Sequence, residues 1–417
     1  MVKDQFLPFI NQSGLKGSGN MAEKYDVIVA GCGPAGLSAA KSAASEGAKV
    51  LALELQAQVG GCTGFASWVP TNLLDSKLKR AVVARLSEVR ARSPWNELTI
   101  RGDFGVIVDR QKFDRLLAAG ASEKGADIWL SAPVMDLIFK GGKVAGVRIK
   151  ASGWSEQIEG EVVVDATGLG GEWSGLFFRK ALNRDWKREL LAFSSEYLMA
   201  NVQDEKSADL VFTSYLAPGG HAWTYPAGKG FAVAGIRGER IHPDIALDEF
   251  LGRYSIPRFS GSVPVASSRS RVFLDGPLDR TCADGIISVG AAAGQLYPFS
   301  GHGISYALRC GEMAGRGAVE AITEGDVSGK RLSAYENAWR SKFGTEFRIG
   351  KLMRASFGVS QDRKIDAMIR MLTEKPKLQR AFIRAFAGFD PEDQLRLLLK
   401  DEDIASVMAK ELRMLVR

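Results

Sequence analysis

The sequence predicts an α/β fold in which a parallel sheet is interrupted by an antiparallel sheet and followed by a helical C-terminal region. Three observations lead to this prediction. The β-branched apolar run 25–30 (YDVIVA) leads directly into a glycine-rich turn, as a buried parallel strand does. Alternating apolar and polar residues between 192 and 236 indicate antiparallel strands. Beyond Ser333, apolar residues recur at spacings of three and four, which is typical of helices.

The segment from Tyr25 to Glu54 has the order of a dinucleotide-binding unit. After the first strand, a helix is expected from Ala35 to Glu46 and a second strand from Val50 to Glu54. Such a unit holds a pyrophosphate at the helix N-terminus, where N–H groups are unpaired and the dipole is positive. Its glycines allow a tight turn, close approach of phosphate and close packing of helix on sheet. The turn comprises Gly31, Cys32, Gly33, Pro34, Ala35 and Gly36.

A carboxylate at the end of the second strand completes this unit. Glu54 stands about twenty residues after Gly31, where it can accept hydrogen bonds from both hydroxyls of an adenosine ribose. A chance glycine turn with a surface glutamate is the alternative, and the strand–turn–helix–strand order favours the dinucleotide site. No second GxGxxG follows a strand, so no separate domain for a nicotinamide dinucleotide is expected.

The remaining elements indicate that the dinucleotide-binding domain is discontinuous. Apolar strands are expected at 158–166, running into Thr167-Gly168, and at 286–289, before a helix from Ile304 to Thr323. Between them, alternating segments indicate an inserted antiparallel sheet, at 192–202, 209–216 and 231–236. We therefore expect a flexible extension with a native start at Met21 (1–22), a discontinuous dinucleotide-binding domain (23–180 and 275–330), an antiparallel-sheet substrate domain (181–274) and a C-terminal helical region (331–417).

Composition narrows the class of protein. A chain of 417 residues with 46% hydrophobic and 25% charged residues is typical of a globular protein with more than one domain. The four cysteines form no CxxC pair, so neither a metal site nor a disulfide framework is expected, and a reducing cytoplasmic location is the simpler interpretation. No apolar run reaches eighteen residues, so no membrane span is expected.

The basic C-terminal region has three interpretations. Residues 331–417 hold 18 Lys and Arg against 12 Asp and Glu, which is +6 of the net charge of +7. Such a region can bind nucleic acid, rest on an anionic membrane or form a solvated helix face; the last is the default, and no nucleic-acid partner is expected. A helix with Phe382, Ile383, Phe386 and Phe389 among basic residues could rest peripherally on a membrane, although packing against the protein body is the simpler explanation.

Four segments in order resemble the FAD-binding segments of the hydroxybenzoate-hydroxylase-type flavoproteins. They are the Gly31 turn, 108–114 (VDRQKFD), 165–168 (DATG) and 290–304 (GAAAGQLYPFSGHGI). Within that superfamily, 221–226 (HAWTYP) is similar to the YxWxFP signature of the geranylgeranyl reductase family, and so is the spacing of Tyr335, Trp339 and Phe343. The resemblance implies a Rossmann-like FAD-binding domain with an inserted antiparallel-sheet substrate domain and a C-terminal helical region.

Members of that family reduce isolated double bonds of isoprenoid chains, in archaeal membrane lipids or in the phytyl tail of chlorophyll. The resemblance therefore implies an FAD-dependent oxidoreductase that saturates a geranylgeranyl-type chain by hydride transfer from the reduced flavin. Its electron donor would be NAD(P)H bound transiently or a ferredoxin-like protein. Flavin-dependent oxygenation or halogenation and electron transfer to quinone are alternatives on the same fold. A relative that has lost FAD and binds a lipid or partner is the non-enzymatic alternative.

The resemblance also implies which residues contact FAD. Cys62 stands where archaeal members tend to carry a cysteine near the isoalloxazine. His302 would lie near the pyrimidine edge, where it either stabilises the reduced anion or fills the turn. Arg110 would reach a phosphate or ribose, or form a surface ion pair with Asp114. The expected contacts are Gly31, Gly33, Pro34, Ala35, Gly36, Glu54, Cys62, Thr63, Arg110, Val134, Gly168, Gly290, Ala291, His302, Gly303 and Ile304.

Four side chains form the expected catalytic group. Reduction of an unactivated alkene builds charge on carbon, which aromatic faces can stabilise. Trp223 and Tyr225, two apart on a strand, would point to the same side and form one wall, or would be ordinary core aromatics. The proton donor is expected among Cys62, Tyr225 and His221, of which His221 titrates nearest neutrality. As a residue type, Cys62 is otherwise a small buried hydrophobe.

Three positions depart from the family pattern. His221 stands where the signature has tyrosine and Tyr225 where it has phenylalanine, so a more polar cavity is expected. Ala291 stands where the superfamily usually has an aspartate that binds the ribityl chain. Loss of that acceptor should weaken or reposition FAD, although the N–H groups of 290–294 and the helix after Gly303 could still hold phosphate.

Overall fold

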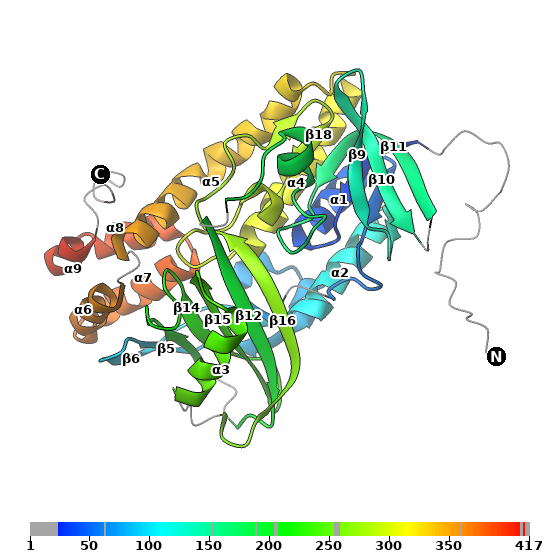
Figure 1. Cartoon of the computed structure of the whole chain (residues 1–417). Helices are drawn as coiled ribbons and strands as arrows, with labels where there is room; N and C mark the ends of the chain where they lie inside the picture. The colour runs from blue at the N-terminus through cyan, green and yellow to red at the C-terminus, as the bar shows by residue number, and fades with distance from the viewer. Residues whose placement is uncertain are drawn as a thin grey trace, which may run out of the picture.

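The structure places two large sheets side by side, with the C-terminal helices arranged along one side of them (Figure 1). It is a computed structural model. It describes residues 24–61, 64–151, 154–187, 190–203, 207–253, 259–357, 361–408 and 412.

An eight-stranded sheet carries the dinucleotide unit. Its strands are β1 (Tyr25–Ala30), β2 (Val50–Leu53), β8 (Asp127–Trp129), β9 (Val134–Lys140), β10 (Lys143–Ala151), β11 (Trp154–Asp165), β17 (Cys282–Ala283) and β18 (Ile286–Ser288). The parallel order is β18-β11-β1-β2-β8, while β9, β10 and β17 pair antiparallel. Apart from Asp26, β1 and β2 consist of buried apolar residues, as is typical of a parallel sheet that helices cover. The predicted strands at 25–30, 50–54, 158–166 and 286–289 are confirmed within a few residues, except that β11 begins earlier.

Two helices pack closely on this sheet, α1 (Pro34–Ser45) and α4 (Ile304–Thr323). A Cβ at Gly311 would overlap the carbonyl of Ala35, and one at Gly315 would overlap that of Ala39. Because both contacts advance along the two helices together, α1 and α4 run in the same direction. Their N-termini therefore point to the same end of the sheet. The predicted helix 304–323 is confirmed.

A seven-stranded sheet forms the second layer, in the order β16-β12-β15-β14-β13-β5-β6. Its strands are β5 (Glu88–Arg92), β6 (Glu97–Arg101), β12 (Leu191–Ala200), β13 (Ser207–Val211), β14 (His221–Pro226), β15 (Phe231–Glu239) and β16 (Val263–Phe273). All neighbours pair antiparallel except β13 and β5. The helix α3 (Pro243–Arg253) covers the face that carries Val211 and Ile236, and its own Phe250 joins them in one apolar cluster.

One predicted strand, 209–216, is wrong in its second half. β13 ends at Val211, and residues 214–216 form a turn. The Asp362 carboxylate accepts hydrogen bonds from the Ser214 N–H at 2.6 Å and from its hydroxyl at 2.7 Å. This contact with a helix distant in sequence removes the chain from the ladder, and local periodicity carries no sign of it.

A small sheet and one further helix connect the two layers. The sheet has the order β3-β7-β4, with β3 (Ala66–Val69), β4 (Val82–Arg85) and β7 (Val106–Asp109). β7 runs directly into α2 (Arg110–Ser122), whose N-terminus is capped by the Asp109 side chain accepting from the Lys112 N–H at 2.9 Å. The sequence predicted neither β3 nor β4.

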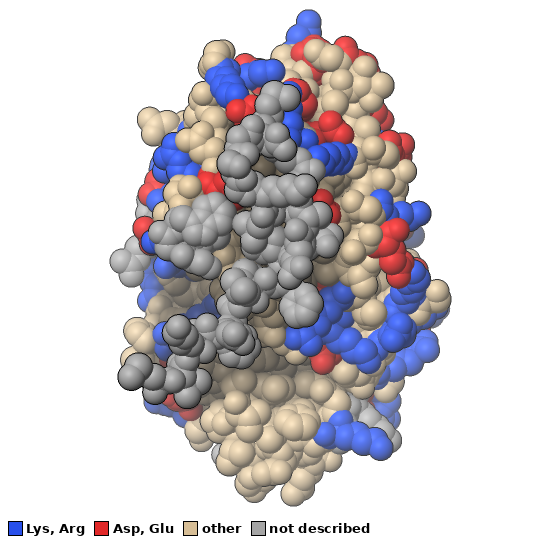
Figure 2. Space-filling model, turned by 90° about the vertical axis from the view of Figure 1, so that its right-hand side faces the viewer, with Lys and Arg blue, Asp and Glu red and all other residues tan. Residues whose placement is uncertain are grey.

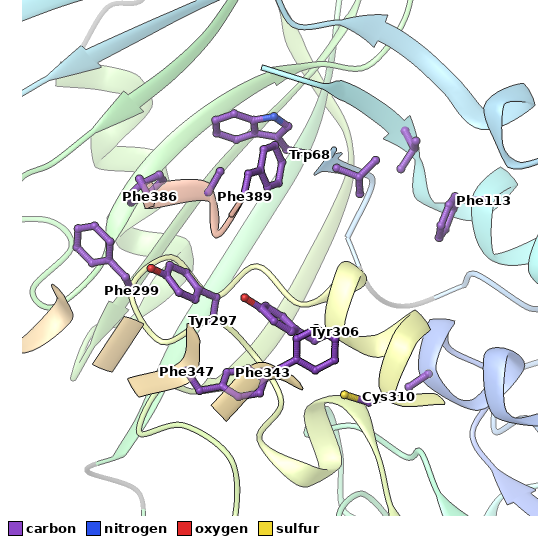
Figure 3. Packing of buried hydrophobic residues seen from close by; sticks show 14 of the residues in the cluster. Trp68, Phe113, Tyr297, Phe299, Tyr306, Cys310, Phe343, Phe347, Phe386 and Phe389 are labelled. Carbon is purple, nitrogen blue, oxygen red and sulfur yellow. The ribbon is translucent and has the colours of Figure 1, made fainter. Parts of the chain in front are cut away.

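The C-terminal region is helical, as predicted. It consists of α5 (Gly329–Phe357), α6 (Gln361–Thr373), α7 (Pro376–Ala387), α8 (Pro391–Leu398) and α9 (Glu402–Val407). Aromatic residues of α5 pack on α4: the Tyr306 ring lies 5.4 Å from Phe343 and 4.6 Å from Phe347 (Figure 3). No helix in the described ranges is both long enough and apolar enough to cross a bilayer.

The membrane interpretation of the helix around 382–389 is wrong. Phe382, Ile383, Phe386 and Phe389 are all buried in the main core, so this side faces the protein. A different part of the surface has few charges: Figure 2 shows them interspersed over the upper part and sparse at the lower end, where the long strands of the second sheet turn. Phe231 at the start of β15 and Val263 and Val265 at the start of β16 are exposed.

Candidate functional site

The turn after β1 leaves open space where the sequence predicts a pyrophosphate. Gly31 has a φ of +103°, and a Cβ there would lie 2.5 Å from the carbonyl oxygen of Ala166. A Cβ at Gly36 would overlap the Gly31 carbonyl, so α1 packs directly on the turn. At Gly33, by contrast, a Cβ would meet nothing within 4 Å. The turn is open at Gly33, where α1 begins with Pro34 and without a side-chain cap.

Glu54 is held beside this turn. Its Oε2 accepts a hydrogen bond from the Cys32 N–H at 3.0 Å, and its Oε1 accepts one from the Gln56 N–H at 2.9 Å. Burial raises the pKa of the Glu54 carboxyl, and the two N–H donors oppose this rise by favouring the ionised form. The carboxylate is therefore fixed at the end of β2 and retains lone pairs for ribose hydroxyls.

The end of β11 forms a second open turn beside the first. The buried Asp165 carboxylate accepts hydrogen bonds from the Thr167 hydroxyl at 2.6 Å and from the Phe177 N–H at 2.8 Å. Its carbonyl accepts from the Val289 N–H at 2.9 Å, which ties this turn to β18. Gly168 has a φ of +70° and open space around it. Asp165 therefore shapes a turn whose ligand-facing position is Gly168.

The loop between β18 and α4 returns to the first turn. A Cβ at Gly290 would lie 2.7 Å from Cβ of Ala35 on α1. The Gly290 N–H donates to Gln295 Oε1 at 2.8 Å, and Gln295 Nε2 donates to the Tyr335 hydroxyl at 3.0 Å. This network uses no side chain from position 291, so Ala291 leaves the loop intact. Gln295, which the sequence did not single out, holds the loop.

Three rings on one face of β14 form a buried wall. The ring centroids of His221 and Trp223 lie 5.3 Å apart, and those of Trp223 and Tyr225 lie 6.3 Å apart in a stacked arrangement. The Trp223 indole covers Gly235 of β15, where a Cβ would overlap it. The expectation that Trp223 and Tyr225 point to the same side is therefore confirmed. Their catalytic role stays a prediction.

Aromatic residues from two other elements face this wall. Trp68 of β3 lies edge-on to Tyr225, with ring centroids 6.2 Å apart. Phe386 of α7 lies edge-on to His221 at 4.9 Å. Phe389, just after α7, contacts Trp68 at 5.5 Å, and Figure 3 shows these two rings together beside Phe386. The sequence gave no signal that β3 and α7 meet β14, because both contacts are distant along the chain.

The titratable groups of the wall are uncharged near neutral pH. Burial, followed by the positive charge of Arg237, lowers the pKa of His221 well below its usual value and that of His302 to about 3. The expectation that His221 titrates near neutrality is therefore wrong. His302 Nδ1 lies 2.7 Å from the Ser300 hydroxyl, so His302 is a neutral member of the turn before α4. Burial raises the pKa of Tyr225, which keeps its hydroxyl proton.

A carboxyl group that the sequence missed lies beside Gly64 and Phe65. Glu196 of β12 accepts a hydrogen bond from the Phe65 N–H at 3.2 Å, and a Cβ at Gly64 would lie 2.7 Å from its Oε2. Burial raises the pKa of Glu196 to about 7, and the Phe65 N–H opposes this rise. Cys62 and Thr63 precede Gly64 but lie outside the described residues. The only sequence signal is a carboxylate on the inward face of an alternating strand.

Arg110 and Val134 are both buried among other residues of the protein. Arg110 Nη2 lies 3.0 Å from Asp114 Oδ2, and its Nη1 donates to the Ser67 hydroxyl at 3.4 Å. Both members of this ion pair are buried, so the alternative of a surface pair is wrong although the pair itself forms. Val134 is buried at the start of β9. Contacts of Arg110 and Val134 with FAD stay predictions.

A cavity of about 300 Å³ opens outside the aromatic wall. Phe389, which contacts Trp68 on its inner side, forms part of the cavity lining. The rest of the lining comes from 70–72, Asp103, Gly105, α4, α5, α7 and the residues just after α7, and it includes Tyr306, Phe343, Arg309, Glu346 and Arg384. The cavity therefore has both aromatic and charged residues in its lining.

Comparisons with known proteins agree with this arrangement. The family model described as FAD dependent oxidoreductase matches residues 26–217. Digeranylgeranylglycerophospholipid reductase 1 of Methanococcoides burtonii is 31% identical over 371 residues, which cover 84% of this chain and 87% of the relative. Digeranylgeranylglycerophospholipid reductase 2 of Methanothermobacter thermautotrophicus is 32% identical over 368 residues, covering 84% and 92%.

Solved structures share the same fold. A geranylgeranyl bacteriochlorophyll reductase-like protein from Thermoplasma acidophilum superimposes with a TM-score of 0.81 at 25% identity, covering 94% of this chain and 99% of that one. A flavin-dependent brominase superimposes with a TM-score of 0.71 at 20% identity, covering 92% and 97%. The second likeness concerns the fold alone.

Proposed function

Because the chain belongs to the digeranylgeranylglycerophospholipid reductase family of FAD-dependent oxidoreductases, we propose that it saturates isolated double bonds in the geranylgeranyl-type chains of a lipid. One observation carries this proposal. The buried wall of His221, Trp223 and Tyr225 offers stacked aromatic faces, enclosed by Trp68 and Phe386. An unactivated alkene needs such surroundings, because charge develops on carbon and no carbonyl group of the substrate can accept it.

The open turns fit FAD. Gly33 offers open space at an uncapped helix N-terminus for the pyrophosphate, and the fixed Glu54 carboxylate offers acceptors for the adenosine ribose. When bound, FAD supplies the hydride for the alkene. The proposed contacts are those expected from the sequence, with Gln295 supporting Gly290 from behind.

The chain itself must hold the second hydrogen as a proton. We propose Glu196 as the group that holds it, because burial brings the pKa of its carboxyl to about 7, near the pH at which an acid works best. Burial raises the pKa of Tyr225, so it keeps its proton too firmly to release it, and its ring forms part of the wall. Cys62 remains a proposed donor on the adjoining loop.

The source of electrons is proposed to be NAD(P)H bound transiently or a ferredoxin-like protein. Either donor must reach the flavin without a second nucleotide-binding domain, since the sequence has no second dinucleotide fingerprint. Anaerobic mixing of the enzyme with NADPH, with NADH and with reduced ferredoxin, followed at the flavin absorbance, decides between them. Bleaching by only one donor identifies it.

The lipid substrate requires access to a bilayer. We propose that the weakly charged end of the seven-stranded sheet makes this contact, through Phe231 of β15 and Val263 and Val265 of β16. Phe231 and Val263 both pair with Ala200 of β12, so they flank the end of that strand on its two sides. A Phe231→Ser, Val263→Ser, Val265→Ser variant is expected to lose sedimentation with lipid vesicles while keeping its FAD.

The function is tested without oxygen. Enzyme reduced with dithionite is incubated with a digeranylgeranylglycerophospholipid, and extracted lipid is analysed by mass spectrometry. The expected result is a gain of two hydrogens for each double bond saturated. Unchanged lipid without oxygen, combined with an oxygenated or halogenated product in air, would contradict the proposal.

A further inference from the structure

Arg237 of β15 is buried between the second sheet and the loop before α4. Only 6% of the surface of Arg237 is exposed. Nη2 donates to the Ser300 carbonyl and lies 3.4 Å from His221 Nδ1, and a Cβ at Gly301 would overlap the guanidinium. Nε has no hydrogen-bond partner, and no carboxylate lies within 4.0 Å of the guanidinium in the part of the chain that the structure describes.

A neighbouring arginine has the partner that Arg237 lacks. Arg354 of α5 forms an ion pair with Glu239, and its Nη1 donates to the Leu274 carbonyl at 3.3 Å. A buried cation without an anion is unfavourable, because the protein interior replaces little of the lost hydration. Arg237 therefore has the surroundings of a group whose anionic partner is not part of the described chain.

The position of this partner follows from the loop that Arg237 contacts. The loop begins at Gly290, against Ala35 of α1, and reaches Arg237 at Ser300. It thus spans the distance from the dinucleotide turn to the aromatic wall, where the reacting ring of the cofactor has to lie. The loop ends at Gly303, where the twenty-residue helix α4 begins without a side-chain cap. An uncapped N-terminus and a guanidinium both favour negative charge.

We propose that Arg237 forms an anion subsite for the negative charge that FAD acquires on its pyrimidine ring when it is reduced. A positive charge near this ring is one of the means by which a protein tunes a flavin. The lowered pKa values of His221 and His302 leave these two neighbours uncharged near neutral pH. Arg237 therefore supplies the positive charge of this group of three residues. The inference depends on FAD binding and not on the identity of the lipid.

The test compares Arg237→Met and Arg237→Lys with Arg354→Met as a matched control. Each FAD-loaded enzyme is titrated anaerobically without lipid to obtain its midpoint potential, and each apo-protein is titrated with oxidised FAD. We expect Arg237→Met to weaken binding of reduced FAD relative to oxidised FAD at least tenfold, which lowers a two-electron potential by about 30 mV. Arg237→Lys keeps the charge and should lose about threefold or less.

The control separates charge at the flavin from folding. Arg354→Met should change the binding of reduced FAD relative to oxidised FAD by less than about twofold. It should lower the unfolding temperature, because it leaves Glu239 unpaired. Arg237→Met should not lower the unfolding temperature of the apo-protein. An unchanged potential in both Arg237 variants would overturn the proposal.

Discussion

The dinucleotide turn and the aromatic wall are built by different means. At the turn, Gly31, Gly33 and Gly36 set the backbone geometry by the side chains they lack, and the neighbouring loop at Gly290 is held by Gln295. At the wall, side chains from β3, β14 and α7 meet across long stretches of sequence. The first region should tolerate changes of side chain but not of backbone geometry, and the second should behave in the opposite way.

The largest effect is expected from Gly36→Ala. Its Cβ would overlap the Gly31 carbonyl, so we expect a loss of about 3 kcal/mol in the free energy of unfolding and no measurable FAD binding. Gly33→Ala is the matched control, because its Cβ meets no protein atom. We expect its apo-protein to unfold at the wild-type temperature, while FAD affinity falls about tenfold or more. Equal loss of stability in both variants would show that Gly33 does not face the cofactor.

At the wall, Trp223→Ala is expected to reduce lipid turnover about 30-fold, because one aromatic face is worth up to about 2 kcal/mol to a desolvated positive charge. FAD affinity should stay within about twofold of wild type, since the indole lies on β14 and not in the dinucleotide turn. Trp223→Phe keeps a ring and should retain most turnover. If Trp223→Ala lowered turnover and FAD affinity together, the wall and the dinucleotide turn would not have separate roles.

Glu196→Gln tests a titratable group that belongs to neither the dinucleotide turn nor the aromatic wall. Burial raises the pKa of Glu196 from 4.5 to about 7, so its contribution to stability is complete below pH 4.5 and is lost as the pH rises through 7. The variant should therefore flatten the dependence of the unfolding temperature on pH between 5 and 8 by about a few degrees. If Glu196 holds the proton, wild-type turnover falls above pH 7 and the variant is about tenfold slower at pH 6. If the unfolding temperature of the wild type does not change across pH 7, the raised pKa is wrong. If its turnover does not change across pH 7, Glu196 does not hold the proton.

The smallest effect is expected from Ala291→Asp. The loop does not depend on this side chain, since Gln295 binds the Gly290 N–H. Restoring the aspartate that related flavoproteins carry should add one acceptor for the ribityl chain and tighten FAD binding about threefold. Ala291→Asn, of the same size but neutral, should give less. Weaker binding in the aspartate variant would mean that negative charge is unfavourable at this end of the site.

The same contrast explains what could be predicted from sequence. Gly31, Glu54 and the strands around them lie within thirty residues, so spacing alone identified the unit, and 304–323 was found by its period. Trp223 and Tyr225 were placed on one face because alternation is local. Trp68, Glu196 and Arg237 were missed, because their importance arises only when β3, β12 and β15 meet. His221 was misjudged for the same reason, since its pKa depends on burial and on Arg237.

The pairing of β5 with β13 limits how this protein can be divided or recombined. β5 and β6 come from the segment 88–101, long before the rest of the seven-stranded sheet, yet they complete its edge. The buried Asp209 of β13 fixes this junction, with Arg90 at 3.3 Å, Arg92 at 3.6 Å and the Thr224 hydroxyl at 2.6 Å. A chimera that exchanges only 181–274 between two relatives would therefore pair β13 of one protein with β5 of the other, and Asp209 would lose its partners where the recipient lacks Arg90 and Arg92. Specificity can move between relatives as a module only if the early hairpin moves with it.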